Sequence, residues 1–294
     1  MKRIGNLEIK HIALLYSQVP PERLEEFQAF RRDFPYTDVT LDERTWSYLS
    51  GGEGDPPALL LSGALAIPDI SYTTITGLAA RRRVIAPVYP PVKTMDALVD
   101  GIAAILQHEG IEQADVVGGS YGGMVAQVFV RRHPHLVRSL VLSHTGAPHP
   151  DSAVRLRRFS RVLRWLPMGM VRQMIRRAFG SMMPERTDDT ACMLAIYNEL
   201  IAFTLGRKDA VGITERAADF ALQPFTPQDL AGWPGKVLLI FGEDDPATPA
   251  EVRERLASLY PGCQVQLFEG AGHTTSVTHR EEYLAVLDGF LAQG

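Results

Sequence analysis

Ala114-Asp-Val-Val-Gly-Gly-Ser120-Tyr-Gly-Gly-Met124 is the stretch that decides the fold, because it contains the end of a strand, a tight turn and the start of a helix. A β-branched run leads into the turn, and residues 124–130 continue with apolar side chains at helical spacing. Glycines at 118 and 122 remove the side chains that would collide in so sharp a turn. The pattern predicts that the Ser120 hydroxyl is exposed between the carboxyl end of a strand and the amino end of a helix.

Two other interpretations of this turn are a phosphate-binding loop and a Gly-rich turn with an idle serine. A phosphate loop would require a following Gly-Lys-Ser/Thr or the G-x-G-x-x-G register, and the sequence has neither. The Gly118-x-Ser120-x-Gly122 pattern, set between a strand and an amphipathic helix, instead indicates a nucleophile elbow.

Length and composition indicate an ordinary globular protein. The 294 residues can form one large α/β domain, or one domain with an inserted subdomain. The chain is 46% hydrophobic and 22% charged, with a net charge of −4 and a pI near 6.1. This balance argues against a nucleic-acid partner.

The location of the protein is expected to be cytoplasmic. The two cysteines, Cys192 and Cys263, have no metal-ligand spacing, which favours a reducing compartment. Charged residues interrupt the apolar run that a signal peptide would need after Met1-Lys-Arg, and no apolar stretch approaches the roughly twenty residues of a membrane span.

Strand and helix patterns alternate along most of the chain. A helix over 20–32 carries Leu24, Phe27 and Phe30 on one face and is expected at the periphery. Another helix is expected over 94–108, with Thr94 as its N-cap, and one directly follows the elbow. Two more helices are expected over 249–259 and 280–291. The strands are expected at 45–50, 58–61, 83–88, 114–119, 137–142, 236–241 and 264–268.

Residues 146–233 contain no strand-like run, and their pattern predicts helices and loops. We therefore expect an α/β fold with a mostly parallel central sheet and helices on both faces. Its core comprises residues 1–145 and 234–294, and residues 146–233 form a helical cap.

A serine hydroxyl needs a base to take its proton and a third group to orient that base. The predicted strand at 236–241 leads into Gly242-Glu-Asp-Asp-Pro-Ala-Thr-Pro249, and the one at 264–268 leads into Glu269-Gly-Ala-Gly-His273. Both loops lie at the carboxyl edge of the sheet, where α/β proteins bind ligands. The chain order Ser120, Asp245, His273 is the order of a nucleophile-elbow hydrolase.

Through these three motifs the chain resembles the α/β-hydrolase superfamily over roughly residues 45–294. The resemblance implies Ser120 as nucleophile, His273 as general base and acid, and Asp245 as the acid that holds the imidazole. Asp244 is the alternative acid. The family pattern favours Asp245 because it places the acid three residues after the glycine and four before the proline.

The resemblance also implies an oxyanion hole made of backbone N–H groups. Tyr121, directly after the serine, supplies one donor. The family's second donor follows the strand at 58–61, usually in a His-Gly pair, and here the sequence is Ser62-Gly63-Ala64-Leu65. Because a backbone donor survives the loss of the histidine, we expect Ala64 to supply it.

A second resemblance, to maspardin-like members of the superfamily, is carried by Phe30-Arg-Arg-Asp-Phe-Pro35 and by residues 118–127. Maspardin is thought to act by binding partners and lacks a full triad, so a non-catalytic binding protein is an alternative. This sequence keeps His273, which the maspardin pattern lacks. We expect neither a metal nor another cofactor, since no histidine pair has metal-ligand spacing. His144, just past the predicted strand at 137–142, is a candidate to line the pocket, and a solvated histidine is the alternative.

The predicted cap is rich in arginine. Between Asp151 and Gly180 there are eight arginines, and Asp151 is the only acid. Either the segment meets an anionic surface or acidic substrates, or its apolar side covers the pocket while the arginines face water. Methionines at 168, 170, 174, 182 and 183 would provide an adaptable apolar roof.

We therefore expect a serine hydrolase, first of all a carboxylesterase that cleaves a small to medium hydrophobic ester through an acyl-enzyme. A carbon–carbon bond hydrolase, a peptidase or an acyltransferase would use the same triad. The expected partner is a small-molecule ester or related acyl substrate, without nucleic acid or a membrane span, and a homodimer is possible.

Overall fold

The computed structural model describes residues 12–183 and 187–293. Its centre is one eight-stranded sheet in the order β1-β2-β4-β3-β5-β6-β7-β8. Strands β3 to β8 are parallel, whereas β1 and β2 pair antiparallel at one edge. The strands are β1 Tyr36–Leu41, β2 Arg44–Gly51, β3 Ala58–Leu61, β4 Val84–Pro87, β5 Ala114–Gly119, β6 Val137–Ser143, β7 Lys236–Gly242 and β8 Gln264–Phe268.

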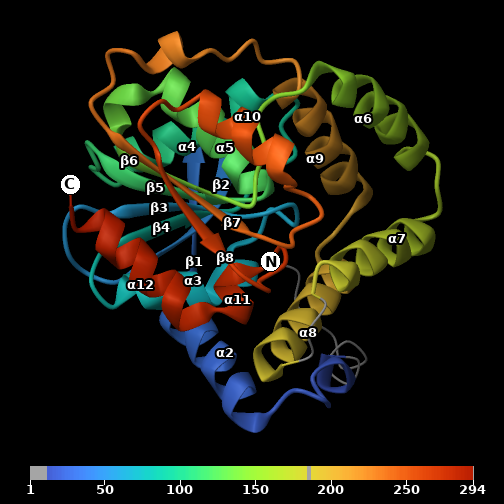
Figure 1. Ribbon diagram of the computed structural model, residues 1–294. Helices are drawn as coiled ribbons and strands as arrows, with labels where there is room; N and C mark the ends of the chain where they lie inside the picture. The colour runs from blue at the N-terminus through green and yellow to red at the C-terminus, as the bar shows by residue number, and fades with distance from the viewer. Residues whose placement is uncertain (1–11, 184–186, 294) are drawn as a thin grey trace.

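Helices cover both faces of the sheet (Figure 1). One face is covered by α4 Met95–His108, α5 Tyr121–Arg132 and α10 Ala250–Ser258, and the other by α2 Pro21–Asp33, α3 Tyr72–Ala79, α11 Thr275–Thr278 and α12 Arg280–Leu291. A large group of buried apolar side chains lies on each face. The mostly parallel α/β fold predicted from the sequence is thus confirmed. Thr94 caps α4 as predicted, since its hydroxyl accepts a hydrogen bond from the Ala97 N–H at 3.1 Å.

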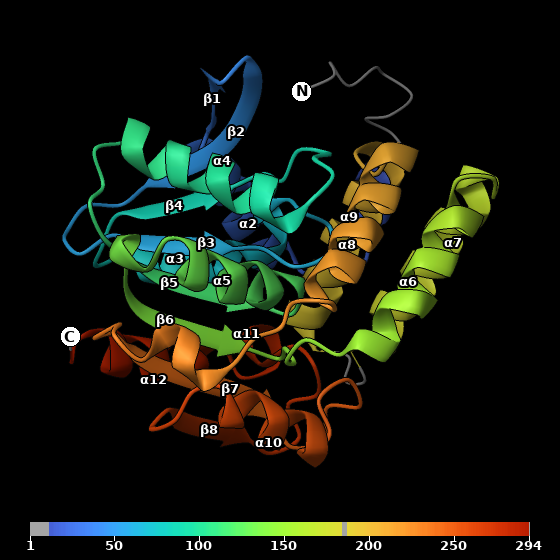
Figure 2. The same ribbon diagram turned by 90° about the horizontal axis from the view of Figure 1, so that it is seen from above.

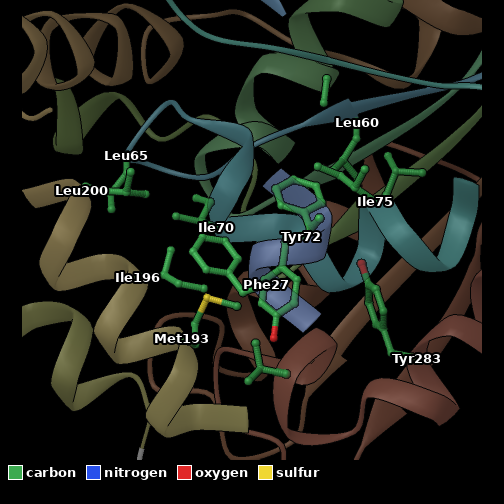
Figure 3. Close-up of a cluster of buried hydrophobic side chains, with 14 of the residues drawn as sticks. Phe27, Leu60, Leu65, Ile70, Tyr72, Ile75, Met193, Ile196, Leu200 and Tyr283 are labelled. Atoms are coloured by element: carbon green, nitrogen blue, oxygen red, sulfur yellow. The ribbon is translucent and has the colours of Figure 1, made fainter. Parts of the chain in front are cut away.

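Helix α2 is not peripheral, in contrast to the expectation from its sequence. Phe27 and Phe30 are buried, and the Phe27 ring lies edge-on to Tyr72 of α3, with 5.2 Å between centroids. Figure 3 shows Phe27 and Tyr72 among side chains from distant segments, including Leu60 of β3 and Met193. Helical periodicity shows which face of a helix is apolar, but the partner of that face comes from the tertiary fold.

Residues 146–233 form α6 Pro150–Leu163, α7 Met168–Ser181, α8 Asp188–Phe203, α9 Arg207–Phe220 and the 3₁₀ turn Pro227–Leu230. We call them the inserted segment. Within it α6 packs on α9 and α7 packs on α8. Figure 2 shows α8 and α9 beside the body of the molecule and α6 and α7 beyond them. Ile196 and Leu200 of α8 lie close to Leu65 and Ile70 of the loop after β3, so the inner helices pack on the core (Figure 3).

Candidate active site

Ser120 stands in a strained turn between β5 and α5. Its backbone has φ 51° and ψ −117°, in the left-handed half of the map that non-glycine residues rarely enter. A Cβ at position 122 would lie 1.9 Å from the Leu61 carbonyl oxygen, and one at position 118 would lie 2.5 Å from the Gly122 carbonyl oxygen. Only glycine fits at either position. The end of β3 and the start of α5 therefore hold the serine at the carboxyl edge of the sheet.

Asp245 lies in the loop after β7 and is 2% exposed. Its Oδ1 accepts a hydrogen bond from the Ala247 N–H at 2.8 Å, and its Oδ2 accepts one from the Thr248 hydroxyl at 2.7 Å. These local bonds fix the direction of the carboxylate. Because β6 and β7 are neighbours in the sheet, this loop also lies beside the end of β6.

His273 follows β8 and lies between the serine and the acid. Its Nδ1 is 2.7 Å from Asp245 Oδ2, and its Nε2 is 3.1 Å from Ser120 Oγ. A carboxylate can only accept, so Nδ1 carries the proton and Nε2 accepts from the serine hydroxyl. The structure thus brings together the three residues that the sequence analysis singles out.

Asp244, the alternative acid, has a different position. It is exposed, and its Oδ1 accepts a hydrogen bond from the Gly272 N–H at 2.9 Å. Asp244 therefore anchors the loop that carries His273, whereas the hydrogen bond to the imidazole comes from Asp245.

His144, a candidate pocket residue in the sequence, is buried against the acid. Its Nδ1 is 3.1 Å from Asp245 Oδ2, and its Nε2 is hydrogen-bonded to the hydroxyl of Thr275. By the same donor rule, Nδ1 donates and Nε2 accepts. Two imidazoles thus donate hydrogen bonds to one carboxylate oxygen. The Nε2 of each accepts a hydrogen bond from a hydroxyl, that of Ser120 for His273 and that of Thr275 for His144.

Two pKa values in this cluster lie below their usual values, each for its own reason. Burial acts to raise the pKa of Asp245, but the hydrogen bonds from His144, His273 and Thr248 outweigh it and hold the pKa well below its usual range. The stabilisation from this carboxylate is therefore present above its ordinary pKa near 3.9 and is lost only as the pH falls below that value. Burial lowers the pKa of His144, so its ring is neutral at pH 7.

The predicted N–H donors lie on two segments that meet beside Ser120. Tyr121 is the first residue of α5, where backbone N–H groups have no partner within the helix. Ala64 lies in the loop after β3, and the close approach of Gly122 to Leu61 and Ser62 places the start of that loop against the elbow.

Arg216 of α9 is a further residue of the region, and nothing in the sequence points to it. It is 1% exposed, and its Nε donates a hydrogen bond to the Tyr121 hydroxyl at 2.8 Å. Its Nη1 donates to the carbonyl oxygens of Pro90 and Val92 at 3.3 and 2.7 Å. Arg216 thereby connects the inserted segment to the residue that follows Ser120.

A cavity of about 160 Å³ lies between the inserted segment and the core. Its walls come from the loop after β3, the segment after β4, and α9 with the residues before it. It is lined mainly by apolar side chains, among them Leu65, Ile67, Val88, Leu205 and Ile213.

His144, Asp245 and His273 also form the one group of donor side chains, within the described residues, whose ligand atoms lie close enough together to hold a metal ion. Hydrogen bonds already account for all three: both Nδ1 atoms face the carboxylate and both Nε2 atoms face hydroxyls. The arrangement of these three side chains is therefore explained by hydrogen bonds alone.

Comparisons with known proteins agree with this architecture. A family model described as alpha/beta hydrolase fold matches residues 87–279. The 2-hydroxymuconate semialdehyde hydrolase of Pseudomonas putida is 27% identical over 263 residues, covering 82% of this chain and 89% of that protein. A pimeloyl-[acyl-carrier protein] methyl ester esterase of Neisseria meningitidis is 29% identical over 225 residues, covering 70% and 78%.

Among solved structures, a hydrolase from Pseudomonas aeruginosa PA01 has a TM-score of 0.74 at 18% identity, covering 87% of this chain and 98% of that one. At this identity the likeness concerns the fold alone. The family match covers about two thirds of the chain, in the region that holds Ser120, Asp245 and His273. The chain belongs to the alpha/beta hydrolase fold family.

Proposed function

We propose that the protein is a serine hydrolase in which Ser120 is the nucleophile, His273 the general base and then acid, and Asp245 the residue that orients the imidazole. The observation that carries this proposal is the hydrogen-bonded chain from Ser120 Oγ to His273 Nε2 at 3.1 Å and from His273 Nδ1 to Asp245 Oδ2 at 2.7 Å. A purely structural serine would not require a buried, fully hydrogen-bonded acid behind its histidine partner.

The reaction would run through an acyl-enzyme. As Ser120 Oγ bonds to the substrate carbonyl carbon, its proton passes to His273 Nε2, and the oxyanion accepts hydrogen bonds from the N–H groups of Tyr121 and Ala64. The carbon–oxygen bond to the leaving alcohol then breaks, and the alcohol takes the proton from Nε2. Water then attacks the acyl carbon as it gives a proton to His273 Nε2. The bond from the acyl carbon to Ser120 Oγ breaks, and Nε2 returns the proton to Oγ, which releases the acid and restores the serine.

We propose a carboxylic ester of small to medium size as the substrate. The apolar cavity beneath the inserted segment suits a short hydrophobic acyl or alcohol group. We propose accordingly that residues 146–233 serve as the cap of a core made of residues 1–145 and 234–294. The similarity to a methyl ester esterase supports ester chemistry.

Carbon–carbon bond hydrolysis is the second candidate, favoured by the similarity to a 2-hydroxymuconate semialdehyde hydrolase over most of both chains. The same triad and N–H groups could serve it, as they could serve a peptidase or an acyltransferase. A non-catalytic binding protein is disfavoured, because the Ser120–His273–Asp245 hydrogen bonds would then serve no purpose.

Assays with two kinds of substrate distinguish ester hydrolysis from carbon–carbon bond hydrolysis. We expect p-nitrophenyl esters from acetate to palmitate to be hydrolysed with a burst, fastest at short and medium acyl lengths because the cavity is small. Ser120→Ala is assayed in parallel as the control. Turnover of 2-hydroxymuconate semialdehyde without ester turnover would replace the first candidate by the second, and a rate that is equal in both proteins would contradict serine chemistry.

We expect His144 to help hold the Asp245 carboxylate in position through their hydrogen bond. In His144→Leu, Asp245 loses one of the donors that fix the direction of its carboxylate, so the carboxylate holds the His273 imidazole less firmly. We expect kcat to fall about tenfold with little change in KM, as the loss of one charge-assisted hydrogen bond implies.

His144→Asn offers an N–H donor in place of the imidazole and is the matched variant. We expect it to keep kcat close to that of the wild type. If His144→Leu and His144→Asn lowered kcat equally, His144 would have only a packing role.

A further inference from the structure

The outer helix pair consists of α6, α7 and the residues 164–167 that join them. The inner side of this pair packs on the neighbouring helices. Ala153, Ser160 and Leu163 of α6 are buried, and α6 packs on α9. On α7, Val171 is buried and Phe179 stacks on Tyr197 of α8, with 4.3 Å between ring centroids. The opposite side faces away from the core (Figures 1 and 2).

That outward side exposes large apolar side chains. On α6 and just after it, Val154, Val162 and Trp165 recur at spacings of eight and three residues, which places them along one side of a helix, opposite the buried face. Met170 and Met174 lie one turn apart on α7. The exposed fractions are 54% for Val154, 50% for Val162, 88% for Trp165, 55% for Met170 and 41% for Met174. None of these residues lines the cavity between the inserted segment and the core.

The segment that carries these side chains is strongly cationic. Residues 151–180 carry eight arginines and one acid, a net +7, in a chain whose total is −4, so the remainder carries −11. Arg164 pairs with Glu215, Arg155 bonds the Ser152 hydroxyl, and Arg172 bonds the Leu205 carbonyl oxygen. Among the arginines of this segment, five make neither a side-chain ion pair nor a side-chain hydrogen bond with the described residues: Arg157, Arg158, Arg161, Arg176 and Arg177. Arg157 and Arg161 line a hollow that also contains Glu215 and Asp219 of α9, whereas the other three do not.

We propose that the outer helix pair docks on an anionic phospholipid surface. Arginine suits this role because its aliphatic stem lies along apolar surface while the guanidinium reaches phosphate. Tryptophan is the side chain that prefers the boundary between headgroups and acyl chains, and Trp165 is the most exposed of the large apolar residues. No helix of the described residues is long and apolar enough to cross a membrane, so attachment would be at the surface.

The positive charge of the outer helix pair favours an anionic lipid surface over a second copy of the chain as the partner. Two such faces would bring sixteen arginines together, with Asp151 of each copy as the only acid between Asp151 and Gly180. An acidic protein would satisfy the arginines. It would however need a fitted pocket for each apolar anchor, whereas a fluid lipid surface accepts side chains interspersed with arginines along a helix.

The test uses the Ser120→Ala protein, so that binding is measured without turnover and independently of the proposed function. We expect it to co-sediment with vesicles of phosphatidylcholine and phosphatidylglycerol (3:1), but not with phosphatidylcholine alone, and to be released by salt. Arg157→Gln/Arg158→Gln/Arg161→Gln should weaken binding about 100-fold, from about fivefold for each arginine near an anionic surface. Trp165 emission should shift to the blue on binding, and Trp165→Phe should abolish that shift.

The matched control is Arg32→Gln/Arg44→Gln/Arg255→Gln, which removes three arginines outside the pair that are exposed or half-exposed, and it should bind as the parent does. Absence of binding to the anionic vesicles, equal weakening in the control, or an unchanged blue shift in Trp165→Phe would each overturn the proposal. Polyglutamate serves as a protein-like polyanion: if it binds as tightly as the vesicles, with no effect of Trp165→Ala, the surface recognises charge alone and the lipid assignment is wrong.

Discussion

Replacement of Ser120 by alanine is expected to lower kcat by at least about 10⁴-fold on any substrate the protein turns over, since loss of the nucleophile removes the acyl-enzyme route. The residual rate would come from the N–H donors and from binding, which the change leaves in place. Alanine keeps the Cβ and adopts the same left-handed turn at φ 51°, so the expected change in the free energy of unfolding is small. Steady-state kinetics on the best p-nitrophenyl ester, with a thermal unfolding curve, measure both effects.

Ser152→Ala is a suitable control for this result, because Ser152 lies on α6 and bonds only Arg155 among the described side chains. It should keep full activity. Retention of more than about a tenth of the wild-type rate in folded Ser120→Ala would remove Ser120 from the nucleophile role.

Asp245→Asn is expected to lower kcat about 10³- to 10⁴-fold with little change in KM. The amide replaces a carboxylate that accepts from two imidazoles, so His273 loses both its orienting acceptor and the charge that stabilises its protonated form. The pKa of Asp245, held well below its usual range, keeps the carboxylate ionised through the neutral and mildly acidic range, so the effect should persist at every pH at which the enzyme is active.

Asp244→Asn is the adjacent control. An asparagine oxygen can still accept the hydrogen bond from the Gly272 N–H, so the loop that carries His273 should hold its position. We expect a loss of no more than about tenfold, the scale of one neutral hydrogen bond. A larger loss in Asp244→Asn than in Asp245→Asn would transfer the orienting role to Asp244.

The strands that lie in the middle of the sheet were predictable from the sequence because they are buried on both faces and read as continuous apolar runs. Strand β1 could not be recognised in this way. It lies at the edge, it contains polar residues, and a two-residue turn joins it to β2. That turn places Asp42 and Glu43 at φ 46° and 61°, where a sequence signal would have been Asn-Gly.

The candidate triad was predictable for a different reason. Its three members each follow a strand, and the carboxyl ends of parallel strands meet at one edge of the sheet. His144 also follows a strand. Its contact with Asp245 depends on β6 and β7 being neighbours and on its own φ of 50°, and neither property can be read from the sequence.

Arg216 shows where sequence patterns give no guidance at all. An arginine in the middle of a helix is usually exposed. Arg216 is buried because three acceptors from distant segments surround it, the Tyr121 hydroxyl and the carbonyl oxygens of Pro90 and Val92. Such a site exists only once the inserted segment has packed on the core.

The most direct measurement of the central claim, that His273 and Asp245 activate Ser120, is labelling with a fluorophosphonate followed by mass spectrometry of the digested protein. It requires no knowledge of the substrate. We predict one adduct per chain on Ser120, formed rapidly in the wild type, slowly in Asp245→Asn, and not at all in Ser120→Ala. An unlabelled wild-type protein, or an adduct on another residue, would contradict the account.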